Sequence, residues 1–181
     1  MSNLNNFSLR PAREDEYDIL NAIKLDACLR FDKDYITRSL ERDISSHDVG
    51  NDSIEVAVDG QDVPQGFTTS FPVDGDLFLY HLYVRREMGK QGLGTILLKE
   101  VIERAASEKR RAVTLCTALN VPWNAPYYSR HGFVVLKDEK MPDYLLKFLN
   151  EDREHFTPQN FPLVLQRPEL LPRVAMERLV L

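Results

Sequence analysis

The sequence has few of the features that mark a membrane, secreted or metal-binding protein. No apolar run reaches the roughly 18 residues that a membrane helix needs, and the polar start at 1–6 lacks the basic and apolar regions of a signal peptide. The two cysteines, Cys28 and Cys116, and the four histidines form no metal-binding spacing. We therefore expect a cytoplasmic protein with no metal site and no structural disulfide.

An excess of positive charge is also absent. The net charge is −5, with 43% hydrophobic and 28% charged residues, values typical of a globular domain. We expect neither nucleic acid nor a membrane as a partner, although Arg85, Arg86 and Lys90 form a local basic patch that can hold phosphates. At this length the whole chain, 1–181, is predicted to be one domain.

The spacing of apolar residues predicts alternating strands and helices. Strands are predicted at 7–10, 54–58, 66–71, 77–84, 111–116, 133–136 and 173–181, and helices at 13–29, 34–44, 93–108, 127–131 and 142–154. A strand, a helix and a strand between 77 and 116 imply a right-handed parallel crossover. The predicted fold class is α+β, a mixed and largely antiparallel central sheet with helices on both faces.

One polar stretch is predicted to begin a helix, and two are predicted to lie outside regular structure. The acidic run 14–16 is expected to be a solvated helix start, and 74–76 a turn before the next strand. Prolines at 158, 162, 168 and 172 predict an irregular excursion at about 155–172, which is either a covering flap or a mobile segment.

A glycine-spaced loop, 89–94, joins the predicted strand 77–84 to the predicted helix 93–108. The first N–H groups of a helix have no internal partners and its dipole favours negative charge, while glycines let the backbone approach a ligand. The loop does not match a P-loop, which needs a lysine before Thr95, or a dinucleotide fingerprint, which needs a glycine at Leu97. It is predicted to bind another anion, the alternative being a glycine-rich turn without a ligand.

Two motifs in this region resemble one family. VRREMGKQGLGTILL (84–98) resembles the acyl-CoA-binding motif of the GNAT superfamily of acetyl-CoA-dependent N-acyltransferases, commonly Gln/Arg-x-x-Gly-x-Gly/Ala. Gly92 and Gly94 match its two glycines, whereas Gly89 occupies the Gln/Arg position and Lys90 a position that is often glycine. TALNVPWNAPYYSRHGF (117–133) resembles a later motif, VPWNxPxYxxxGF, of one bacterial-type branch, and RVAMER (173–178) resembles the ending of that branch.

The resemblance implies a GNAT-like fold with acetyl-CoA as co-substrate. The backbone of Leu82 and Val84 would pair with the pantetheine arm, and backbone N–H groups from about Gly89 to Thr95 would hold the pyrophosphate. The cofactor-binding residues that it implies are Leu82, Tyr83, Val84, Gly89, Lys90, Gln91, Gly92, Leu93, Gly94, Thr95, Asn120 and Asn124. For Asn124, a helix cap before Ala125 is the structural alternative.

The implied reaction is direct attack of an amine on the thioester. By the resemblance, Tyr128 is the catalytic tyrosine that hydrogen-bonds the sulfur as negative charge develops. Related sequences often carry a glutamate where Tyr80 stands, so the base is open between His81 and a water relay. Strand alternation is expected to put His81 on the face opposite Tyr80.

The resemblance does not select an acceptor, which is either a small-molecule amine or a protein amine. The family builds the acceptor side from parts corresponding to 31–42 and the proline-rich excursion, and a homodimer stays open. Two rival functions remain. One is a non-catalytic acyl-CoA sensor, and the other uses Cys116 as a nucleophile with His131 or His81.

Overall fold

The computed structural model describes residues 7–30, 53–155, 157 and 172–180. The strands are β1 (Ser8–Pro11), β2 (Ser53–Val58), β3 (Pro64–Val73), β4 (Asp76–Val84), β5 (Ala112–Ala118), β6 (Val134–Val135) and β7 (Arg173–Leu179). The α-helices are α1 (Tyr17–Cys28), α3 (Leu93–Ser107), α4 (Ala125–Ser129) and α5 (Asp143–His155), and 3-10 turns lie at Glu14–Glu16, Arg86–Met88 and Asp138–Lys140. The predicted helix 34–44 and most of the predicted excursion 155–172 lie outside the described residues.

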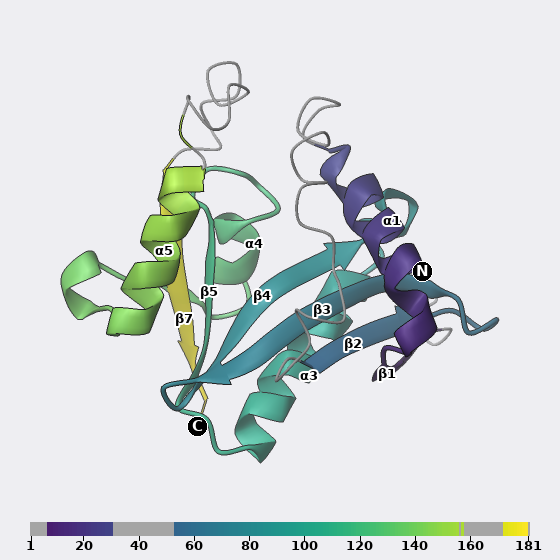
Figure 1. Ribbon diagram of the computed structural model, residues 1–181, viewed down its shortest axis with the longest axis horizontal. Coiled ribbons are helices and arrows are strands. Elements are labelled where there is room, and N and C mark those ends of the chain that lie inside the picture. The colour runs from purple at the N-terminus through teal and green to yellow at the C-terminus, as the bar shows by residue number, and fades with distance from the viewer. Residues whose placement is uncertain (1–6, 31–52, 156, 158–171, 181) are drawn as a thin grey trace. The chain divides into compact units, whose positions relative to one another are not determined.

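The strands form one mixed sheet in the order β1-β2-β3-β4-β5-β7-β6 (Figure 1). β1 with β2, β2 with β3, β5 with β7 and β6 with β7 are antiparallel. β4 and β5 are parallel, with Leu77 opposite Val113 and Phe78 opposite Thr114. The predicted α+β class and the parallel connection through the helix after the glycine loop are therefore confirmed.

The chain divides into two compact units. The first comprises 1–72 and 79–104, and the second comprises 73–78 and 105–181. In the first unit, α1 and α3 cover opposite faces of the strands (Figure 1). Val56 and Val58 of β2 pack with Leu20 and Ile23 of α1, whereas the intervening Ala57 packs against α3. This alternation is the period of two expected of a strand that is buried on both faces.

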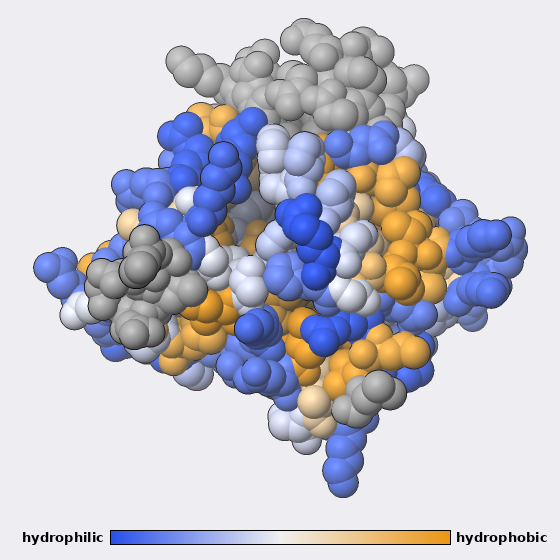
Figure 2. Space-filling model, turned by 180° about the vertical axis from the view of Figure 1, so that it is seen from behind, coloured by the Kyte–Doolittle hydropathy of each residue, from blue (hydrophilic) through white to orange (hydrophobic). Residues whose placement is uncertain are grey.

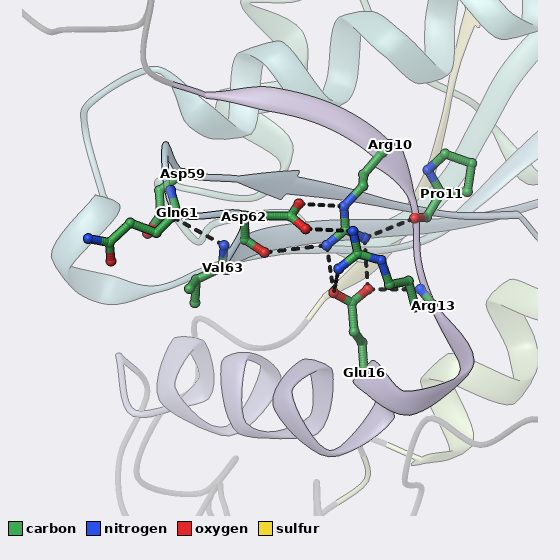
Figure 3. A network of polar contacts seen from close by, with 8 residues as sticks. All are labelled: Arg10, Pro11, Arg13, Glu16, Asp59, Gln61, Asp62 and Val63. Atoms are coloured by element: carbon green, nitrogen blue, oxygen red, sulfur yellow. Dashed lines mark hydrogen bonds and ion pairs between the residues drawn. The ribbon is translucent and has the colours of Figure 1, made fainter.

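A charged network fixes the start of the first unit (Figure 3). Arg10 donates to Oε1 of Glu16 at 2.6 Å and to Oδ1 of Asp62 at 2.8 Å, and Arg13 donates to Oδ2 of Asp62. The backbone N–H of Arg13 donates to Oε2 of Glu16 at 2.8 Å. Glu16 is only 8% exposed, so the expectation of a solvated acidic run was wrong at this residue. It is a buried partner of Arg10 and Arg13, and these two arginines bind Asp62 in the turn between β2 and β3.

The second unit is built on β5 and β7, with α5 packed against them. Leu145 and Leu149 on α5 are fully buried, and the ring of Phe148 lies 4.8 Å from that of Phe78. Asp76, which the sequence places in a turn, begins β4 and is 1% exposed. That expectation was wrong because Asp76 accepts hydrogen bonds from Arg111 and from α5.

The surface combines apolar and polar areas. On the face drawn in Figure 2, hydrophobic residues (orange) lie in separate areas among hydrophilic ones (blue). Across the described residues, no helix has both the length and the apolar composition needed to cross a membrane. In the same residues, no three His, Cys, Asp or Glu side chains are arranged to hold a metal ion.

Candidate functional site

The glycine loop of the first unit adopts the conformation that its glycines and Lys90 allow. Gly92 has a φ of 90° and Lys90 a φ of 63°. Both values lie in the left-handed region, which favours glycine. This explains why glycine is common at the position of Lys90 in the resembling motif. The two reversals turn the chain from the end of β4 into α3, which begins at Leu93.

The loop and the first turn of α3 present a run of backbone donors. The N–H groups of Gly89 and Thr95 are already used, donating to the carbonyl oxygens of Arg86 at 3.0 Å and Gly92 at 2.9 Å. Within the described part of the chain, no residue accepts a hydrogen bond from the N–H groups between those two positions. These are the N–H groups of Lys90, Gln91, Gly92, Leu93 and Gly94. Successive backbone donors at a helix start are an arrangement that favours a bound anion.

The end of α1 holds the beginning of this loop. The backbone N–H of Arg86 donates to Oδ2 of Asp26 at 2.7 Å, and Nε of Arg86 donates to Oδ1 at 3.0 Å. Burial alone would raise the pKa of Asp26, but the hydrogen bonds from Arg86 hold it below its ordinary value. Asp26 could not be found from the sequence, because no local pattern connects it to a residue 60 positions later.

The candidate base, His81, lies among aromatic rings on β3 and β4. Its Nδ1 is 2.9 Å from Oγ1 of Thr69, a side chain that is 5% exposed. Its ring lies 5.4 Å from that of Tyr83 and 4.2 Å from that of Tyr80. Neighbouring side chains on opposite faces of a strand could not bring their rings so close. The expectation that His81 and Tyr80 face opposite sides was therefore wrong, and β4 departs from regular alternation at this point.

The other predicted residues of β4 lie in the wall of the first unit. The side chain of Val84 packs with Leu93 and Leu97 of α3, and the ring of Tyr83 lies 5.6 Å from that of Phe67. Leu82 is half-buried. Their backbones lead directly into the loop. At the end of β4, the N–H of Arg85 still donates to the carbonyl oxygen of Gln65 on β3 at 2.9 Å.

Tyr128 lies on the short helix α4 of the second unit. Its ring contacts those of Tyr127 at 5.2 Å and Phe133 at 5.6 Å, both edge-on. Burial raises the pKa of the Tyr128 hydroxyl, and Tyr127 adds to the effect, so the hydroxyl keeps its proton at neutral pH. In the part of the chain that the structure describes, no side chain or backbone group hydrogen-bonds this hydroxyl. Among the described residues it is therefore a neutral donor without a hydrogen-bond acceptor.

The two candidate asparagines flank the loop before α4. Asn124 occupies the position of the helix cap, but its side chain makes no capping hydrogen bond. Its backbone carbonyl accepts from the N–H groups of Tyr127 and Tyr128, at 2.8 and 3.1 Å. The backbone of Asn124 thus fixes the loop of Tyr128, and the capping alternative for its side chain is wrong. Asn120 is exposed.

Cys116 lies on β5 of the second unit. Burial raises its pKa to about 12 and Asp152 adds to the effect, against the smaller opposing effects of Arg173 and Arg153. Nucleophilic cysteines have a lowered pKa and sit beside positive charge. The arrangement favours Cys116 as a packed thiol.

With this geometry established, comparison with known proteins identifies the domain. Residues 50–135 match the family model of the acetyltransferase (GNAT) domain. Over those residues the chain is similar to GNAT acetyltransferases. The matched residues contain β4, the glycine loop, α3 and Tyr128. The narrower VPWNxPxYxxxGF branch stays a prediction.

Solved structures share the fold of the GNAT domain over nearly the whole chain. A GNAT-family acetyltransferase from Staphylococcus aureus is 13% identical with a TM-score of 0.62, over 97% of this chain and 99% of that one. PaiA N-acetyltransferase from Thermoplasma acidophilum, solved with coenzyme A, is 14% identical with a TM-score of 0.64, over 96% and 98%. A protein described as histone acetyltransferase HPA2 and related acetyltransferase, from Corynebacterium glutamicum, is 16% identical with a TM-score of 0.65, over 97% of each chain.

Proposed function

We propose that this GNAT domain is an N-acetyltransferase that moves the acetyl group of acetyl-CoA to a primary amine. The observation that carries the proposal is the run of five backbone N–H groups from Lys90 to Gly94 at the start of α3. A pyrophosphate has the charge and the acceptor oxygens to use such donors together. The complex of the Thermoplasma relative with coenzyme A supports acyl-CoA as the donor.

The GNAT domain would hold acetyl-CoA by backbone more than by side chains. Lys90 to Gly94 would bind the pyrophosphate, and the backbone of Leu82 and Val84 would pair with the amide groups of the pantetheine arm. Tyr83, Gly89 and Thr95 would shape this wall of the site, because the N–H groups of the latter two are used within the loop. The Asn124 side chain, which does not cap α4, and the exposed Asn120 would contact the arm.

The reaction is a direct transfer. The amine nitrogen attacks the thioester carbon, the carbon–sulfur bond breaks, and the coenzyme A thiolate leaves and is then protonated. An amine with a pKa of about 10.4 costs roughly 4 to 5 kcal/mol to deprotonate at pH 7. His81 is the proposed acceptor of that proton, and its hydrogen bond to Thr69 orients the ring. A water relay is the alternative route.

Tyr128 would act on the leaving group as a hydrogen-bond donor. A thiolate of pKa about 8.5 is a weaker base than the anion of an ordinary tyrosine of pKa about 10. Burial moves the pKa of Tyr128 higher still, so full proton transfer to sulfur is uphill. A neutral donor that strengthens its hydrogen bond as charge develops lowers the barrier without giving up its proton.

Thiol release from acetyl-CoA tests the proposal across a panel of small-molecule amines and lysine-containing peptides. We expect amine-dependent release of free thiol, together with an acetylated product detected by mass spectrometry. Binding of coenzyme A without turnover on any acceptor would favour the non-catalytic acyl-CoA sensor, which the tyrosine at position 80 keeps open. No binding of coenzyme A would contradict both functions.

A further inference from the structure

Arg30, just after the end of α1, lies against Gly89 at the start of the glycine loop. A Cβ atom built on Gly89 would be 2.8 Å from Nη2 and 3.7 Å from Cζ of Arg30. It would also lie 2.9 Å from the carbonyl oxygen of Arg86. Gly89 has a φ of −62° and a ψ of 145°, a conformation open to any residue. The backbone oxygen of Arg86, and not backbone strain, therefore favours glycine here, and the flexible guanidinium of Arg30 lies in the same space.

The position of Arg30 follows from the contact between α1 and the loop. Asp26, four residues earlier, binds both the backbone and the side chain of Arg86, and the N–H of Arg30 donates to the carbonyl oxygen of Ala27 at 3.3 Å. The end of α1 is thus attached to the loop through Arg86. The guanidinium of Arg30 lies beside Gly89, the residue that precedes the first of the five open N–H groups.

The two arginines near the loop, Arg86 and Arg30, differ in their ion pairs. The charge of Arg86 is offset by its ion pair with Asp26 at 3.0 Å. Within the described residues, the guanidinium of Arg30 pairs with no carboxylate, and Arg30 is exposed. A guanidinium offers several N–H donors in one plane, which matches the oxygens of a phosphate. An arginine of this kind beside a set of open backbone donors completes an anion site.

We propose that Arg30 binds the pyrophosphate of acyl-CoA from the end of α1, in place of the long polar side chain that is missing at Gly89. This inference rests on the proposed use of acyl-CoA. It assigns the phosphate contact to a residue that lies 59 positions before Gly89 and outside residues 50–135, the matched family domain. The glycine and the arginine then act as a pair, because a side chain at 89 would displace the guanidinium.

Calorimetric affinities for three ligands test the assignment in the full chain. The ligands are coenzyme A, 3′-dephospho-coenzyme A, which keeps the pyrophosphate, and pantetheine, which has no phosphate. Arg30→Ala is expected to lower the affinities for coenzyme A and 3′-dephospho-coenzyme A by the same factor, about ten-fold or more. The affinity for pantetheine is expected to stay unchanged. Arg30→Lys is expected to recover part of the loss, since it keeps the charge but not the planar donor set.

Arg13→Ala is the matched control. It removes the same charge from the first unit, but Arg13 precedes α1 and binds Asp62, so all three affinities should match the wild type. Thermal midpoints without ligand show that each variant is folded. Equal binding of coenzyme A by the wild type and Arg30→Ala would overturn the role of Arg30 alone. A loss confined to coenzyme A would overturn it in favour of the 3′-phosphate, and a wild type that binds no coenzyme A would overturn the proposed function as well.

Discussion

The hydroxyl of Tyr144 on α5 donates a 2.6 Å hydrogen bond to Oδ2 of Asp76, a carboxylate that is 1% exposed at the start of β4. Arg111 donates to the same oxygen, also at 2.6 Å. Because the proton of Tyr144 points to Asp76, Thr114 on β5, 3.0 Å away, is the donor to the Tyr144 oxygen. Burial and then Asp76 raise the pKa of Tyr144. One buried carboxylate therefore connects β4, β5 and α5 in the second unit.

Tyr144→Phe is expected to lower the free energy of unfolding by about 1 to 3 kcal/mol, because buried Asp76 loses one of its two donors. Urea unfolding followed by circular dichroism measures the change. A double-mutant cycle with Asp76→Asn isolates the contact from the loss of the ring's other interactions. Strictly additive effects of the two substitutions would show that the hydrogen bond contributes nothing to stability.

The sequence predicts the features of this fold that depend on nearby residues. The glycine loop follows from Gly92 and Gly94 and their place between a strand and a helix, and the predicted strands and helices match the described elements within a few residues. Asp76 was misplaced because an aspartate beside Gly75 is typical of a turn. Its role depends on Arg111 and Tyr144, 35 and 68 residues later.

Some contacts in the candidate site could not be predicted either, because they also join residues far apart in the sequence. Asp26 belongs to α1 and Arg30 follows its end, and nothing in the spacing of that helix shows that its last turn meets the loop at Gly89. The position of the His81 ring beside Tyr80 depends on a local departure from strand alternation. A strict period of two cannot predict where such a departure occurs.

Glu16→Gln is expected to destabilise the protein at pH 7 by about 2 kcal/mol, since the charged hydrogen bonds to Arg10 are weakened. Those hydrogen bonds chiefly hold the pKa of Glu16 below its ordinary value of 4.5, against the opposing effect of burial. A carboxylate with a lowered pKa stabilises the fold above its unfolded pKa, and this contribution disappears as the pH falls through the folded value. The difference in the free energy of unfolding between wild type and Glu16→Gln should therefore shrink below about pH 4.5.

The measurement is urea unfolding of both proteins from pH 7 down to the acid limit of the folded state. Glu14→Gln serves as the control, because Glu14 is an exposed carboxylate of the same 3-10 turn. It should change stability by less than about 0.5 kcal/mol at every pH. A wild-type advantage over Glu16→Gln that stays constant into acid would contradict the ion-pair explanation.

Cys116 should react slowly with iodoacetamide in the folded protein, because burial raises its pKa to about 12 and the thiolate is the reactive form. At pH 8 its alkylation, followed by peptide mass spectrometry, is expected to be slower than that of a free thiol by at least a hundred-fold. Cys116→Ala should keep acetyltransferase turnover within about three-fold of the wild type. Complete loss of turnover in a folded Cys116→Ala protein would instead support the cysteine-nucleophile alternative.

Tyr128→Phe is expected to lower kcat by about ten- to a hundred-fold while leaving the affinity for coenzyme A nearly unchanged, because its hydrogen bond strengthens only as the thiolate forms. The raised pKa keeps the hydroxyl protonated throughout the assay range, so the ratio of wild-type to variant rates should stay flat up to about pH 10. Steady-state kinetics with calorimetric binding of coenzyme A separates the two effects.

Tyr127→Phe, which removes the neighbouring hydroxyl from the same helix, should keep kcat near the wild-type value. An unchanged kcat for Tyr128→Phe would remove Tyr128 from the chemistry, and an equal loss in both variants would indicate a general disturbance of α4.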